Sequence, residues 1–175
     1  MADGEKLQDF QKIFRDFLDF REWDDEIEFI ESTEKWMIST TIRINEQSAK
    51  LFIEGNDESG VLGIFIYYDI KCKENKQPEM VKLFNWTNQY CFTGHLQCLS
   101  DGTLRWKNQI DCEGATMTGF NLSVNFQHGW NIVERYADAI NSVALTKMSA
   151  EEAIEEFNEA LAAAAAAEDN TPDEL

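Results

Sequence analysis

Hydrophobic side chains recur every third or fourth residue near the N-terminus and alternate with polar ones further along the chain. The first pattern predicts an amphipathic helix over roughly residues 4 to 22, with its apolar side formed by Leu7, Phe10, Ile13, Phe14, Phe17 and Leu18. Ile27 and Phe29 predict a short first strand. Alternation from Lys35 to Asn45 predicts a longer strand, half buried in a sheet.

Two further strands follow this one after short polar turns. They correspond to the segments AKLFIE and VLGIFIYYDIKC. In the second segment we assign one alternating set of side chains to the core: Leu62, Ile64, Ile66, Tyr68, Ile70 and Cys72. Because the links between successive strands are short, we expect the strands to pair as an antiparallel meander.

The stretch from Pro78 to Cys112 predicts a helix followed by a β-hairpin. Pro78 suits a first helical turn, because its missing N–H would have no partner there. The apolar positions of this helix share one side and are Met80, Phe84, Thr87 and Cys91. Gly94 is a plausible left-handed stop after the helix.

The hairpin turns at Asp101-Gly102, and its register follows from which side chains would face each other. A two-residue turn would place Cys98 opposite Arg105 and mix apolar with charged side chains on each face. A three-residue loop, Ser100 to Gly102, instead pairs Leu96 with Trp106 and Cys98 with Leu104. Gln97 then faces Arg105, and His95 faces Lys107. We therefore predict the three-residue loop.

The segment after Cys112 fits two patterns. Residues 120–126 alternate like a strand, but a helical pattern covers twice that length and continues to Ala144. We predict a helix from about Ser123 to Thr146, in which Gly129 costs about 1 kcal/mol relative to Ala.

The C-terminal region predicts one more helix. Ser149 and Glu152 form a capping box that starts this helix at Ala150. Ile154, Phe157 and Leu161 give it an apolar edge. We expect one α+β domain over residues 1–167 and a disordered acidic tail over residues 168–175.

The charge of the chain restricts its partners. The net charge is −18, and residues 151–175 contain nine acidic side chains with no Lys or Arg. Binding to nucleic acid or to an anionic membrane through a general basic field is therefore not expected. The N-terminal sequence has no signal-peptide pattern and no long apolar run follows, so we expect a cytoplasmic protein. Its four cysteines are then expected to be reduced thiols.

Candidate catalytic and metal-binding residues are few. Cys91, His95 and Cys98 lie close in sequence, but His95 and Cys98 point to opposite faces of one strand. The acidic residues occur mostly in runs, which are usually solvated, and neither glycine-rich phosphate-binding motif is present. We predict no catalytic residues, no metal site and no cofactor.

Three aromatic residues are the candidate partner-binding side chains. Phe65 and Tyr67 fall on the strand face opposite Ile64 and Ile66, and Trp86 lies off the apolar side of its helix. One interpretation is that the terminal helices cover these rings. The other is that the rings form an apolar patch that binds a partner.

Several segments resemble the YbjN family of small bacterial proteins, which are described as sensory transduction regulators. The similarity covers roughly residues 25–157 and includes LFNWTN, the strand from Phe92 to Leu99, the Asp101-Gly102 turn, TLRWKNQID, a long helix and MSAEEAI. The resemblance implies the fold of type III secretion chaperones, an antiparallel sheet with helices packed on it. Such chaperones are typically homodimers that bind protein segments without catalysis. The chain differs in its longer first helix and its Ala-rich acidic tail.

We therefore expect a non-enzymatic protein-interaction or regulatory module that forms a homodimer. The net charge of −18 suggests a basic or amphipathic partner segment. The alternative is a small-ligand-binding protein or enzyme with a pocket between sheet and helices, using carboxylates or His128.

Overall fold

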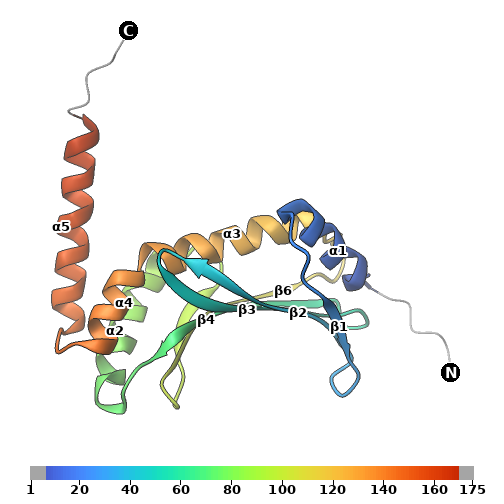
Figure 1. Cartoon of the computed structure of the whole chain (residues 1–175), viewed down its shortest axis with the longest axis horizontal. Helices are drawn as coiled ribbons and strands as arrows, with labels where there is room; N and C mark the ends of the chain where they lie inside the picture. Colours follow the sequence, from blue (N-terminus) through green and yellow to red (C-terminus); the bar gives the residue numbers. More distant parts are fainter. Residues whose placement is uncertain (1–6, 170–175) are drawn as a thin grey trace, which may run out of the picture.

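The computed structural model describes residues 7–169, which form an α+β fold with one antiparallel sheet (Figure 1). The six strands lie in the order β1-β2-β3-β4-β6-β5. Their bounds are β1 Ile27–Ile30, β2 Lys35–Ile44, β3 Gln47–Asn56, β4 Val61–Lys71, β5 His95–Cys98 and β6 Thr103–Asp111. The predicted fold class and the predicted meander of β1 to β4 are confirmed.

The chain leaves the meander after β4 and passes through η1 (Glu74–Lys76), α2 (Gln77–Thr87) and η2 (Asn88–Tyr90) before it reaches β5. β5 forms the sheet edge, and β6 returns between β5 and β4. The predicted hairpin register is confirmed, since Leu96 pairs with Trp106 and Cys98 with Leu104.

Helices α1 (Phe10–Arg21) and α3 (Gly119–Arg135) lie on one face of the sheet (Figure 1). The apolar side of α1 is buried as predicted through Phe10, Ile13, Phe14, Phe17 and Leu18. The prediction is wrong for Leu7, which precedes the helix and is exposed. The predicted start near residue 4 is wrong, because Asp9 caps the helix through a 3.1 Å bond from Lys12 N–H.

The predicted continuous helix from Ser123 to Thr146 is also wrong. The helix starts earlier, at Gly119, and it breaks at Tyr136, after which α4 (Ala137–Leu145) takes a new direction. The Tyr136 ring is buried and packs against Trp86 of α2 and Phe157 of α5 (Ala150–Asp169). After the break, α4 packs against α2 and α5 and keeps a contact with β4.

The Trp106 ring lies so close to two backbone positions, 129 and 94, that only glycine fits there. A Cβ at Gly129 would lie 2.4 Å from the Trp106 ring, so α3 approaches the sheet as closely as it does only because this residue has no side chain. Gly94 has φ +64° and also faces the Trp106 ring. Its predicted role as the stop of the preceding helix is wrong, because α2 ends at Thr87 and η2 at Tyr90.

The last helix begins at the predicted capping box. Glu152 accepts a 2.8 Å hydrogen bond from Ser149 N–H, and Ser149 Oγ accepts one of 3.3 Å from Glu152 N–H. In Figure 1, α5 projects away from the sheet beyond its contacts with α2 and α4. The helix continues to Asp169, past the predicted start of the tail at residue 168, and residues 170–175 of that prediction lie outside the described residues.

The second face of the sheet is open. Within residues 7–169, the helices lie on the other face or at the end of the sheet (Figure 1). The interpretation that the terminal helices cover Phe65 and Tyr67 is therefore wrong: α1 lies on the opposite face, and α5 packs beside α2 and α4. None of the helices in this part of the chain is long and apolar enough to cross a membrane.

Candidate functional site

Three aromatic rings form a cluster on the open face of the sheet. Phe52 of β3 pairs with Phe65 of β4, and Tyr67 follows on the same face of β4. The Tyr67 ring centroid lies 5.6 Å from that of Phe52 and 6.4 Å from that of Phe65. All three side chains are half-buried, because each ring covers part of its neighbours. The cluster leaves aromatic surface accessible at the centre of the sheet.

Two cationic side chains of β6 lie against these rings. Arg105 pairs with Tyr67, and Lys107 pairs with Phe65. The Arg105 guanidinium lies 5.4 Å from the Phe65 centroid and 5.7 Å from that of Tyr67, while Lys107 Nζ lies 5.9 Å from Phe65. Arg105 also donates hydrogen bonds to Gln97 Oε1 (2.8 Å) and to the Tyr67 hydroxyl (2.9 Å). The guanidinium is thus held in place beside the rings.

Trp86, the third predicted partner-binding residue, does not join this cluster. It lies on α2 and packs edge-on against Tyr90, Tyr136 and Phe157. Its ring is half-buried at the junction of α2, α4 and α5. The structure therefore brings Phe65 and Tyr67 together and places Trp86 in a different part of the molecule.

Phe52 and the two cations were not predicted from the sequence. Phe52 alternates with Leu51 and Ile53, so the alternation alone could have placed it on the outward face. The predicted hairpin register already put Arg105 and Lys107 on one face. No sequence signal indicates that β6 pairs with β4, and this pairing is what brings the cations to the rings.

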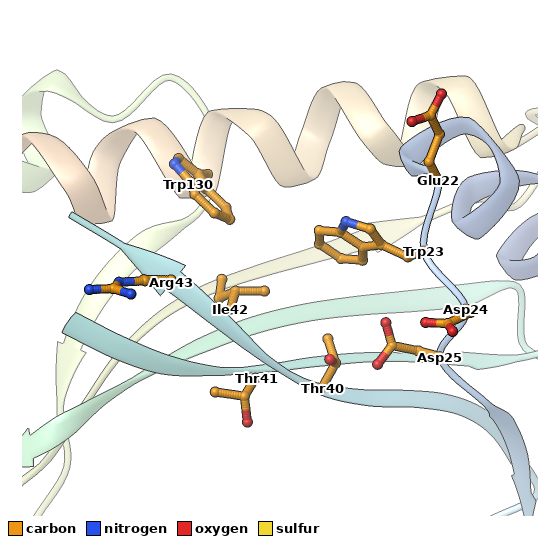
Figure 2. A pocket seen from close by; sticks show the side chains of 9 residues that line it. All are labelled: Glu22, Trp23, Asp24, Asp25, Thr40, Thr41, Ile42, Arg43 and Trp130. Carbon is orange, nitrogen blue, oxygen red and sulfur yellow. The ribbon is translucent and has the colours of Figure 1, made fainter. Parts of the chain in front are cut away.

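A second candidate site is a cavity of about 390 Å³ between β2, α3 and the link that joins α1 to β1 (Figure 2). Trp23 and Trp130 face this cavity above Ile42, and Asp24 and Asp25 approach it from the link. β1 pairs with β2 only as far as Ile38, so the cavity lies beside the part of β2 that pairs with β3 alone. Indole rings beside carboxylates suit an organic cation of small size.

The thiols and histidines lie apart from both sites. His95 points to the open face and contacts Gln97, whereas Cys98 points inward, as the strand alternation predicts. Burial raises the pKa of the Cys98 thiol to about 11, and the neighbouring Cys72 thiol adds to this shift. The exposed His128 ring faces Phe92. In the described part of the chain, no group of three or more His, Cys, Asp or Glu side chains is arranged to hold a metal ion.

Comparison with known proteins adds no assignment for this chain. No protein-family model matches it, and no curated protein sequence matches it.

Proposed function

We propose that this chain is a non-enzymatic protein-interaction or regulatory module that binds a segment of a partner protein on the open face of its sheet. The observation that supports this proposal is the cluster of Phe52, Phe65 and Tyr67 on a sheet face that no helix of residues 7–169 covers. A whole aromatic side chain can bury about 150–250 Å², and the exposed parts of these three half-buried rings lie together, which suits the central anchor of an interface.

The resemblance to YbjN proteins favours the same class of function. The family is described as regulatory, and the chaperones it resembles in fold bind protein segments. A sheet with an open face is compatible with that mode, because this face remains available to a partner. We further propose a cytoplasmic location.

Homodimer formation belongs to the same proposal, but the open face is a poor surface for it. Two copies related by a two-fold axis would bring Arg105 and Lys107 of one copy towards the same side chains of the other. We propose that the dimer uses the outer surface of α5, where Leu161 is exposed. Light scattering at tens of micromolar protein should give about twice the 20.2 kDa chain mass, and a mass near 20 kDa would refute the dimer.

The second candidate function is small-ligand binding in the cavity of Figure 2. The specific observation is the pair of half-buried tryptophans, Trp23 and Trp130, beside the carboxylates of Asp24 and Asp25. Titration with small organic cations, followed by tryptophan fluorescence, tests this function. A Trp130→Ala variant should lose any such signal.

Replacement of both Phe65 and Tyr67 by Ser tests the protein-interaction proposal. The partner is first captured from the native cell with the full chain, identified, purified and measured for direct binding. The double variant should lose this binding and keep the far-UV spectrum and a cooperative melt, because neither ring belongs to the buried core. A matched control is Phe20→Ser with Phe120→Ser, which removes two exposed rings on the opposite face.

The control variant should bind the partner like the parent. If it loses binding equally, or if the Phe65 and Tyr67 variant binds normally, the partner does not use the open face. Unfolding of the Phe65 and Tyr67 variant would show that the rings are structural, and the binding surface would lie elsewhere.

A further inference from the structure

The open face of the sheet carries charge of the opposite sign to the whole chain. The chain has a net charge of −18, but the side chains around the aromatic cluster include Lys50 on β3 and Arg105 and Lys107 on β6. Arg43 follows on the outward side of β2. We refer to Lys50, Phe52, Phe65, Tyr67, Arg105 and Lys107 together as the cationic-aromatic face.

Acidic side chains on outward strand positions lie mainly at the other end of the sheet. Glu28 and Glu54 lie on either side of Met37 in one row across the sheet, and Gly63 is the next residue in that row. The Glu54 carboxylate forms an ion pair with Lys35 Nζ at 2.7 Å. Asp111 lies still further along, opposite Val61, and Asp69 lies in the irregular stretch between Tyr67 and Lys71. The positive charge is therefore concentrated around the rings.

The cations of this face have no acidic partner among residues 7–169. Lys50 donates a 2.6 Å hydrogen bond to the Thr41 hydroxyl, and Arg105 donates only to the neutral groups of Gln97 and Tyr67. The ion pairs of this part of the chain involve other lysines. The pKa of His95, on the same face, is lowered by partial burial and then by the charges of Lys107 and Arg105. The face is thus locally positive and available for an anionic group.

Local charge decides which segment can lie against the rings. Charges in solution are screened over about 8 Å at physiological ionic strength, so the remote carboxylates affect the approach of a partner more than its contacts. A basic segment, which the net charge suggested, would bring its cations against Arg105 and Lys107. An acidic segment would place its carboxylates beside three cations that have no acidic partner among residues 7–169.

The dimensions of the face favour a helix as the occupant. The rings and cations span β3, β4 and β6, and these two strand spacings amount to about 10 Å. A helix with its side chains is about 10–12 Å wide. An apolar stripe would lie on Phe52, Phe65 and Tyr67, with acidic side chains towards Lys50 on one side and Lys107 on the other.

We infer that the partner segment is an acidic amphipathic helix of another protein, which packs its apolar stripe on the cationic-aromatic face and pairs its carboxylates with Lys50, Arg105 and Lys107. This inference rests on the proposed function, because it names the chemistry of the segment that the open face binds. Nucleic acid fits the face less well, because its phosphate backbone would extend beyond the face and lie against the acidic side chains of the rest of the molecule.

The test uses the full chain and two labelled synthetic peptides of about 18 residues, about the length of five helical turns. Both carry the same Leu and Phe stripe, flanked by Glu in one peptide and by Lys in the other. Binding is followed by fluorescence anisotropy at two salt concentrations. We expect the Glu peptide to bind at least about tenfold more tightly than the Lys peptide, with an affinity that falls as salt is raised.

Charge reversal on the face provides the decisive comparison. The double variant Arg105→Glu with Lys107→Glu should bind the Glu peptide about tenfold or more weakly than the parent does, and it should bind the Lys peptide more tightly. The matched control is Lys73→Glu with Lys147→Glu, two exposed lysines outside the face that change the net charge equally. This control should bind both peptides like the parent. Lys50→Glu, an exposed single change on β3, serves the same purpose if the double variant does not fold.

The outcomes separate this inference from the proposed function. Tighter binding of the Lys peptide, lost in the Phe65→Ser and Tyr67→Ser variant, would overturn the acidic partner and leave the interaction module standing. If the parent chain binds neither peptide more tightly than the Phe65→Ser and Tyr67→Ser variant does, the result counts against both the acidic partner and the interaction module. Two further results would overturn the inference: tighter binding of a 12-nucleotide single-stranded oligonucleotide that depends on Arg105, or self-association of the chain that disappears on charge reversal. In these cases a nucleic acid or a second copy occupies the face.

Discussion

Gly129→Ala tests the close approach of α3 to the sheet. Alanine is intrinsically better than glycine inside a helix by about 1 kcal/mol, so this change would normally stabilise the protein. Here the new Cβ would lie 2.4 Å from Cζ3 and 2.6 Å from Cε3 of Trp106. Trp106 has no exposed surface, so its ring has little room to move away.

The expected change follows from these two opposing effects. Overpacking of a filled core costs about 1–3 kcal/mol, and a contact with a fully buried ring should lie at the upper end. After subtraction of the helix-propensity gain, we expect a net loss of about 2 kcal/mol in the free energy of unfolding. Urea unfolding should show this loss as a lower midpoint with an unchanged slope. Glu134→Ala, at an exposed position of the same helix, should change stability by less than about 0.5 kcal/mol.

A double-mutant cycle tests the physical cause. In a Trp106→Leu background the ring is absent, and Gly129→Ala should then stabilise the protein by up to about 1 kcal/mol. The sign of the effect should therefore reverse between the two backgrounds. If Gly129→Ala destabilises both backgrounds equally, Trp106 is not the obstacle and the packing argument is wrong.

Three further predictions concern the core, the C-terminus and one turn. Trp106→Ala should cost about 3–5 kcal/mol of unfolding free energy, and a loss under about 1 kcal/mol would contradict its burial. A chain that ends at Ala167 should melt within about 2 °C of the full chain, because the acidic end offers little apolar area; a large decrease would mean that it packs on the fold. The Thr103 hydroxyl, Lys71 and Thr103 N–H lower the pKa of Asp101 from its ordinary 3.8 to about 2. The unfolded chain then binds more protons between these values, so stability should rise with pH across this range, and Asp101→Asn should reduce the slope of the urea midpoint against pH.

Local periodicity was enough to predict much of this fold. The alternation in β4 identified the buried face of that strand, because successive side chains of a strand always point to opposite sides. The hairpin register followed from matching Leu96 with Trp106. The capping box at Ser149 marked the start of α5, since both of its hydrogen bonds form within four residues of chain.

The open face was only half predictable. Alternation placed Phe65 and Tyr67 on the side away from the core, but it contained no information about what covers that side. Net charge suggested a basic partner, whereas the charges that lie beside the rings are those of Arg105 and Lys107. These side chains reach the rings because β6 pairs with β4, some forty residues away in sequence.

The tertiary structure alone decided the long-range arrangement. It placed β6 between β4 and β5, broke the predicted long helix at Tyr136 and put α1 and α3 on the same face of the sheet. It also brought Trp23 and Trp130 together around the open cavity beside β2. The physical reason is that periodicity tells which side chains of one element share a face, and the order of strands and the cover of each face depend on how all apolar faces are buried together. The sequence by itself therefore determined most of the elements and the inner and outer sides of α1 and β4, and the packing of the elements determined which outer side was left for a partner.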